Sequence, residues 1–150
     1  MKRNEYDHGI HKYRFRYLNE RISKLNVSGP QAQYLVKMLH SGGKVLMNDM
    51  VGESAYHKSH TTRAINELEE NGLVTKEKNP DDKRGYLLYL TEKGKETAKG
   101  VHIALEEFED FVNTVVTDEE RETIKNITKK VYHLLRTYYD EEDIIDENSI

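Results

Sequence analysis

Residues 82–94 read DKRGYLLYLTEKG, a charged turn that leads into a run of apolar and aromatic residues. Residues 86–90 of this run have the composition of a strand, and so do residues 73–78, LVTKEK. The polar stretch 79–85 lies between them and contains Pro80. Two short strand-type runs joined by such a loop predict a β-hairpin. The pattern changes at Thr91, where helical spacing begins.

A helix is predicted over residues 57–71, directly before the first strand of the hairpin. The pair Asn71-Gly72 ends it, because glycine readily takes the left-handed conformation of a helix C-terminal cap. Upstream, residues 44–47 predict a very short strand, and Asn48 predicts the cap of a short helix that runs to Glu53. The residues that face inward on the longer helix are Ala64, Ile65 and Leu68.

Amphipathic helices are predicted on both sides of this segment. Pro30 suits the first turn of a helix capped by Ser28, and Thr117 with Glu120 has the pattern of a capping box. In these helices the apolar residues recur at steps of one to five, mostly three or four. The stripes are Ile10, Tyr13, Tyr17, Leu18, Ile22 and Leu25; Ala32, Leu35, Met38 and Leu39; Ala98, Val101, Leu105, Phe108, Val112 and Val115; and Ile124, Ile127, Val131, Leu134 and Tyr138.

The order helix, helix, short strand, helix, helix, strand, charged loop, strand, long helix, helix contains the order of a winged helix-turn-helix. The predicted fold class is therefore mainly α with a small β-hairpin (α+β), a winged helix-turn-helix with N- and C-terminal dimerisation helices. Within a single chain, 1–150, we assign a DNA-binding lobe to 30–95. Dimerisation helices are assigned to 5–27 and 96–139, and an acidic tail to 140–150.

Composition limits the classes of function. The 150 residues include no cysteine, which excludes disulfide scaffolds and thiol chemistry. No apolar run is long enough to cross a membrane, so we expect a cytoplasmic protein with no membrane partner. The net charge is −4, but the last eleven residues contain six acidic residues and no lysine or arginine. This tail is interpreted as a solvated extension or as a segment that competes with phosphates.

The start of the helix at 57–71 has the chemistry of a DNA contact. Hydroxyls, cations and the backbone N–H groups of a helix N-terminus all bind phosphate oxygens. Arg63 is long enough to reach a base edge or a phosphate. The alternative is an ordinary surface helix that begins with polar residues. The predicted contacts on this helix are Lys58, Ser59, His60, Thr61, Thr62 and Arg63, and those on the hairpin are Lys83 and Arg84.

The hairpin matches the pattern D-x-R-x-x-x-(aliphatic)-x-L-T-x-x-G from Asp82 to Gly94. Together with Asn66-x-Leu68-Glu69-x-Asn71-Gly72-Leu73-Val74, this resembles the MarR family of winged helix-turn-helix regulators over about residues 6–139. The resemblance implies that Arg84 enters the minor groove or grips its phosphates, and that Asp82 orients Arg84 through an ion pair. A turn that is merely hydrophilic is the alternative. His57 and His60 depart from the usual pattern.

The resemblance also implies a two-fold dimer that is joined through the terminal helices and places two recognition helices in successive major grooves. The narrow heptad-like stripes agree with helix-helix packing, although packing within one chain remains an alternative. The residues assigned to dimerisation are Leu105, Phe108, Val112, Ile127, Val131 and Leu134.

Members of the family are similar in binding small molecules between the dimerisation helices and the DNA-binding lobe. Here a phenolic or anionic effector is expected at Tyr13, Arg16, Tyr17 and Tyr34, since tyrosine offers an apolar ring and a polar tip. Tyrosines that fill helix interfaces are the alternative. His102 and Glu106 have a spacing that can chelate a metal. No second pair is evident, so neither a metal nor a cofactor is expected.

The predicted function is that of a sequence-specific, double-stranded DNA-binding transcriptional regulator. We expect a ligand-responsive repressor that acts as a homodimer on a pseudo-palindromic operator. A winged-helix module for protein interaction and a metal-responsive regulator are the alternatives. An enzyme is not expected, because the sequence has no Ser-His-Asp spacing and no phosphate-binding glycine loop.

Overall fold

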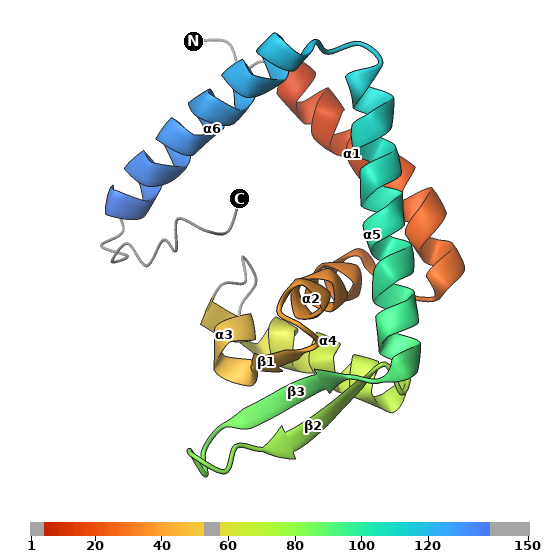
Figure 1. The fold of residues 1–150 in the computed structure, drawn as a ribbon, viewed down its shortest axis with the longest axis vertical. Coiled ribbons are helices and arrows are strands. Elements are labelled where there is room, and N and C mark those ends of the chain that lie inside the picture. The colour runs from red at the N-terminus through yellow and green to blue at the C-terminus, as the bar shows by residue number, and fades with distance from the viewer. Residues whose placement is uncertain (1–4, 53–57, 139–150) are drawn as a thin grey trace. The chain divides into compact units, whose positions relative to one another are not determined.

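The computed structural model describes residues 5–52 and 58–138, which form helices and one small antiparallel sheet (Figure 1). The described chain divides into two compact units, one up to Glu109 and one from Asp110. The elements in order are α1 (Glu5–Ile22), a 3-10 turn (Ser23–Leu25), α2 (Gly29–His40), β1 (Lys44–Leu46), α3 (Met47–Gly52), α4 (Lys58–Glu70), β2 (Val74–Lys78), β3 (Tyr86–Leu90), α5 (Glu92–Asn113) and α6 (Asp118–Tyr138).

The predicted hairpin is confirmed and is widened by a third strand. The strand order is β1-β3-β2, so β3 lies between the other two. Val74 pairs with Leu90 and Lys78 with Tyr86 across the hairpin, while Val45 of β1 pairs with Leu88. In Figure 1 the turn between β2 and β3 lies at the end of the hairpin away from α4 and α5. The hairpin is thus attached to the helices at one end only.

A single core joins α2, α4, the sheet and the first half of α5, and it includes Ile22 at the end of α1 and Met50 of α3. Burial of apolar side chains from these elements supplies the main stabilising free energy of the lobe. The inward positions predicted for α4 are confirmed, because Ala64, Ile65 and Leu68 are all buried. The largest fully buried apolar side chains are Leu35, Met38, Met50, Ile65, Leu68, Leu88, Val74 and Val101.

Local capping signals are confirmed where they involve neighbouring residues. Ser28 caps α2, its hydroxyl accepting the Gln31 N–H while the Gln31 side chain accepts the Ser28 N–H. Gly72 ends α4 with φ +72°. The prediction that Asn48 caps the short helix is wrong, since α3 already begins at Met47 and Asn48 lies inside it. Glu53 and His57 lie outside the described residues.

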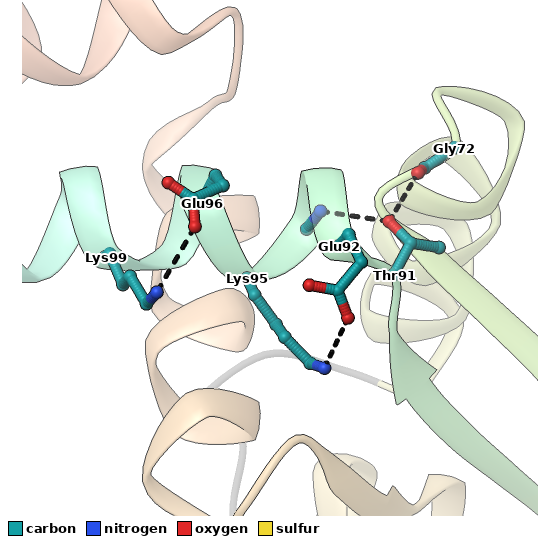
Figure 2. Close-up of polar contacts among 7 residues, drawn as sticks. Gly72, Thr91, Glu92, Lys95, Glu96 and Lys99 are labelled. Carbon is teal, nitrogen blue, oxygen red and sulfur yellow. Dashed lines mark hydrogen bonds and ion pairs between the residues drawn. The ribbon is translucent and has the colours of Figure 1, made fainter.

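The joint between β3 and α5 explains the L-T-x-x-G part of the motif (Figure 2). The Thr91 hydroxyl donates to the Gly72 carbonyl at 2.7 Å and accepts the Gly94 N–H at 2.9 Å. A Cβ on Gly94 would lie 1.9 Å from the Leu73 carbonyl oxygen. Glycine is therefore required at position 94 for α5 to start this close to the end of α4.

The heptad-like stripe of α5 is divided between two environments. Ala98 and Val101 are buried in the core, and Leu105 packs partly against it. The ring of Phe108 meets that of Tyr17 edge-on, with centroids 5.3 Å apart. The stripe residues from Ala98 to Phe108 thus make contacts within the chain. Two of them, Leu105 and Phe108, had been assigned to dimerisation.

Candidate nucleic-acid interface

The outward face of α4 forms an open hollow lined by polar side chains. Helical spacing places these residues together, because positions three and four apart lie on one face. Four of them (Lys58, Ser59, Thr62 and Arg63) were predicted from the sequence. The full lining is Lys58, Ser59, Thr62, Arg63, Asn66, Glu67 and Glu70.

Thr61 was predicted to contact DNA, and the structure contradicts this prediction. Its side chain is fully buried and shares a hydrogen bond of 2.9 Å with the Tyr34 hydroxyl. The reason is helical periodicity, since position 61 is on the same face as Ile65 and Leu68. A small hydroxyl is accepted there because Tyr34 of α2 satisfies it.

The side chain of Arg63 is exposed and is one of those that line the hollow. Its Nε–H donates to Glu67 Oε1 at 3.0 Å, one turn further along α4. The Thr62 hydroxyl donates a hydrogen bond to the Lys58 carbonyl oxygen at 2.9 Å. Arg63 and Lys58 therefore supply the positive charge of this face.

The β2–β3 hairpin, called the wing from here on, keeps Lys83 and Arg84 exposed. The ion pair predicted between Asp82 and Arg84 is not formed. Asp82 Oδ1 accepts the backbone N–H of Arg84 at 2.9 Å, and the Asp82 carbonyl accepts the Gly85 N–H. Within the described residues the Arg84 guanidinium has no ion-pair partner. Asp82 therefore shapes the turn through the backbone, and the arginine side chain projects from it.

The base of the wing is tied to α4 by Lys76 of β2. Its ammonium donates to Asn66 Oδ1 at 3.0 Å and lies 3.5 Å from a Glu69 carboxylate oxygen. It also lies over the Tyr86 ring of β3, 5.3 Å from the centroid. Sequence reasoning missed this residue, because contacts between a strand and the preceding helix leave no local pattern. Lys76 helps to fix the position of the hairpin beside α4.

A second hollow of about 610 Å³ lies between α1, α2 and the inner part of α5. Its floor is apolar, with Leu18, Ile22 and Val101, and the ionisable side chains among its lining residues are all basic. A cleft of this size and mixed character suits a small amphiphilic anion. The lining is His11, Arg14, Phe15, Leu18, Asn19, Ile22, Gly29, Pro30, Ala32, Gln33, Val36, Lys37, His40, Val101 and Leu105.

The four residues predicted to bind an effector do not line this cleft. Tyr13 is exposed on another face of α1, and Arg16 pairs with Glu20 at the surface. The Tyr17 ring stacks under Arg21, with 3.5 Å between the ring centroid and the guanidinium carbon. Tyr34 is buried against Thr61. The face of α1 that does line the cleft carries positions 11, 14, 15, 18 and 22, and Tyr13, Arg16 and Tyr17 are not among them.

His102 and Glu106 lie side by side as their spacing predicts, with His102 Nε2 3.4 Å from Glu106 Oε1. The ring of His40 approaches His102 edge-on, with centroids 5.2 Å apart. Across residues 5–52 and 58–138, no three histidine or acidic side chains form a group suited to a metal ion. None of the helices in these ranges is long and apolar enough to cross a bilayer.

The winged lobe described above lies within the part of the chain that a known protein family matches. A family model described as transcriptional regulator SarA/Rot matches residues 16–101, from α1 to the middle of α5. The chain belongs to the SarA/Rot family of transcriptional regulators. The matched residues include α4 and the β2–β3 hairpin of this SarA/Rot-type chain.

Individual relatives agree with this family. The HTH-type transcriptional regulator BilQ of Clostridioides difficile (strain CD3) is 33% identical over 82 residues, which are 54% of this chain and 55% of that protein. The chain thus spans about half the length of this relative.

Solved structures share the fold. One is a putative MarR-like transcription regulator from Bacillus cereus, with 28% identity, a TM-score of 0.70, and coverage of 87% of this chain and 93% of that one. A putative MarR family regulator from Listeria monocytogenes, complexed with a 26mer DNA, has 24% identity and a TM-score of 0.77, and the two chains are covered to 97% and 100%. The resemblance to the MarR family, inferred from the D-x-R and L-T-x-x-G pieces, is confirmed.

Proposed function

We propose that this regulator is a homodimer that binds a pseudo-palindromic operator in double-stranded DNA and represses transcription in the cytoplasm, without catalytic activity. The observation that carries the proposal is the pairing of two cationic features on one lobe. Arg63 and Lys58 lie on the outward face of α4, and Arg84 projects from the tip of the attached hairpin. A helix of this width fits the major groove, and an arginine beside it suits the narrow, negative minor groove.

Dimerisation is supported by apolar side chains that remain at the surface. Val112 is half-buried, while Ile127, Val131 and Leu134 of α6 are 56%, 50% and 70% exposed. A helix with a regular apolar stripe is stable in water when a second helix covers that stripe. A second copy of the chain is the occupant that a two-fold operator requires.

Response to a small molecule is supported by the basic, apolar-floored cleft between α1, α2 and α5. Arg14 and Lys37 would pair with a carboxylate or phenolate, and the apolar floor would cover its ring. This places the effector beside α2, whose far side packs against α4. A ligand that changes the position of α2 would thus act on the recognition helix.

The proposal is tested by measuring affinity for a random-sequence duplex and for duplexes enriched from a random pool, across a range of salt concentrations. Each phosphate neutralised by a lysine or arginine contributes about −0.9 to the slope of log affinity against log salt. We expect a steep negative slope and enrichment of inverted-repeat sites. A winged-helix module for protein contact would show neither.

Arg84→Ala tests the wing directly. We expect weaker duplex binding and a shallower salt slope, with unchanged thermal unfolding, since the side chain has no partner within the described part of the chain. Lys24→Ala, which removes one exposed cation far from α4 and the hairpin in sequence, is the control for charge alone. Equal affinity of the Arg84 variant and the wild type would disprove the wing assignment.

The cleft is tested with 4-hydroxybenzoate as the probe, by its effect on the thermal unfolding temperature. A ligand that binds the folded state alone raises this temperature. Arg14→Gln is expected to reduce the increase, whereas Arg16→Gln, on a surface outside the cleft, should leave it unchanged. Equal behaviour of both variants would contradict the proposed site.

A further inference from the structure

A series of hydrogen bonds runs from the first turn of α2 to the outward face of α4. Gln31 lies in that turn with its side chain buried, and both ends of its amide are bonded. Its Oε1 accepts the Ser28 backbone N–H at 2.9 Å, and its Nε2 donates to Glu67 Oε2 at 2.9 Å. The other oxygen of Glu67 accepts the Arg63 Nε–H at 3.0 Å.

The chemistry of the partners fixes the orientation of each group. A backbone N–H can only donate and a carboxylate can only accept, so one orientation of the Gln31 amide satisfies both. Rotating the amide would leave buried polar atoms unpaired, which is costly. Glu67 is consequently held through one oxygen by a buried, fixed donor. Its second oxygen is presented to Arg63 in a defined position.

This arrangement leaves one edge of the Arg63 guanidinium available. Glu67 uses the Nε–H, and Arg63 has no further hydrogen bond or ion pair in the described structure. The Nη1 and Nη2 groups therefore form the free end of a side chain that is 82% exposed. Two such N–H groups match the O6 and N7 acceptors of guanine in the major groove. A base edge requires a guanidinium with a fixed plane, whereas a phosphate accepts many orientations.

We propose that Gln31 and Glu67 are positioning residues that hold Arg63 so that it reads a guanine base. The base preference of the recognition helix is thus set partly from α2. This proposal rests on the proposed function, in which α4 enters the major groove. It adds two residues to those that determine the base preference. Neither the buried amide of Gln31 nor the carboxylate of Glu67 is expected to touch DNA.

The experiment is selection of duplexes from a random pool, followed by sequencing, with the wild type and the variants Arg63→Ala, Glu67→Gln and Gln31→Met. We expect the wild type to prefer guanine at one position of each half-site. All three variants should lose that preference at the same position, with discrimination against other bases falling about tenfold, as for loss of one bidentate contact. In the Arg63→Ala background, Glu67→Gln should cause no further loss, because residues acting through one contact are not additive.

Two variants serve as matched controls. Glu70→Gln removes a negative charge from the same hollow without touching Arg63, so it measures the general gain in affinity from removing charge repulsion. Asn113→Met replaces a side-chain amide by methionine, as Gln31→Met does, at an exposed position that lines neither hollow, the last residue of α5. Both should keep the wild-type guanine preference. Glu67 is half-exposed, so Glu67→Gln keeps the test valid even if Gln31→Met lowers the unfolding temperature.

Several outcomes would overturn the proposal. If Glu67→Gln keeps the preference that Arg63→Ala loses, Arg63 needs no tether. If Arg63→Ala also keeps the preference, this arginine contacts a phosphate and not a base. If either of these results is found while the wild-type chain binds duplexes and enriches a sequence, only the positioning role of Gln31 and Glu67 is refuted. A wild-type chain that binds no duplex at low salt would refute the proposed function as well.

Discussion

Single residues in this chain often have a role that their type alone does not reveal. Thr91 and Gly94 belong to the motif that indicates the family, yet their contacts are structural. The threonine hydroxyl joins the end of α4 to the start of α5, and the glycine permits the close approach to Leu73. Asp82 similarly shapes the turn through a backbone N–H. The motif thus describes how the wing is built, and Arg84 is the part of it left free to bind.

Gly94→Ala tests this interpretation at the residue scale. A Cβ at 1.9 Å from the Leu73 carbonyl oxygen forces α5 away from α4, so we expect a loss of about 3 kcal/mol in the free energy of unfolding, the upper end for overpacking. Urea unfolding followed by circular dichroism measures it. Gly9→Ala is the matched control, since its Cβ would meet no atom within 4 Å. That variant should gain up to about 1 kcal/mol from helix propensity.

At the scale of elements, α6 depends on its own cap. The Glu120 carboxylate accepts the Thr117 backbone N–H at 2.9 Å and the Thr117 hydroxyl at 3.1 Å. These two hydrogen bonds, the backbone one first, lower the pKa of Glu120 from its ordinary value of 4.5. A lowered folded-state pKa means that the cap stabilises the helix above about pH 4.5. This stabilisation is lost as the pH falls through the lowered pKa.

The predicted result is a Glu120 carboxyl that titrates below 4.5 by NMR, with fraying of the first turn of α6 at lower pH. Thr117→Ala removes the hydroxyl donor and should move the pKa back toward 4.5. Thr123→Ala is the control, because the Thr123 hydroxyl donates to the Glu119 carbonyl and not to Glu120. A Glu120 pKa that is the same in all three proteins would show that the Thr117 hydroxyl does not stabilise the carboxylate.

At the scale of the whole molecule, the apolar residues assigned to dimerisation separate into two groups. Val131 is half-exposed on α6, so Val131→Asp should leave the winged lobe folded and prevent association. Sedimentation should then show the mass of one chain where the wild type shows two. Lys129→Asp changes the charge on the opposite side of the same helix and should not alter the mass. Persistence of the dimer in Val131→Asp would contradict an interface through α6.

Leu105→Asp is expected to act differently, although both positions belong to sequence stripes of the same kind. Leu105 packs partly against the core and lines the cleft. A carboxylate placed there loses hydration without a partner. We therefore expect a lower unfolding temperature at every protein concentration, measured by circular dichroism. A variant that associates less but unfolds like the wild type would place Leu105 in the interface between chains.

Features that depend on residues within one or two turns of each other could be predicted from the sequence alone. The Ser28 and Thr117 caps, the left-handed Gly72, the hairpin and the helix order are of this kind, since a cap or a turn is a hydrogen bond between near neighbours. The family followed from the same local motif. Helical spacing also gave most of the outward face of α4.

The contacts between side chains of distant segments could not be predicted in this way, and they are seen in the folded chain. Thr61 and Tyr34 are 27 residues apart, and their hydrogen bond removes both from the predicted sites. The link from Gln31 to Glu67 and the basic cleft beside α2 arise in the same way. Such contacts depend on how α2 packs against α1, α4 and α5, and packing is set by the shape of the whole core, which no short stretch of sequence specifies.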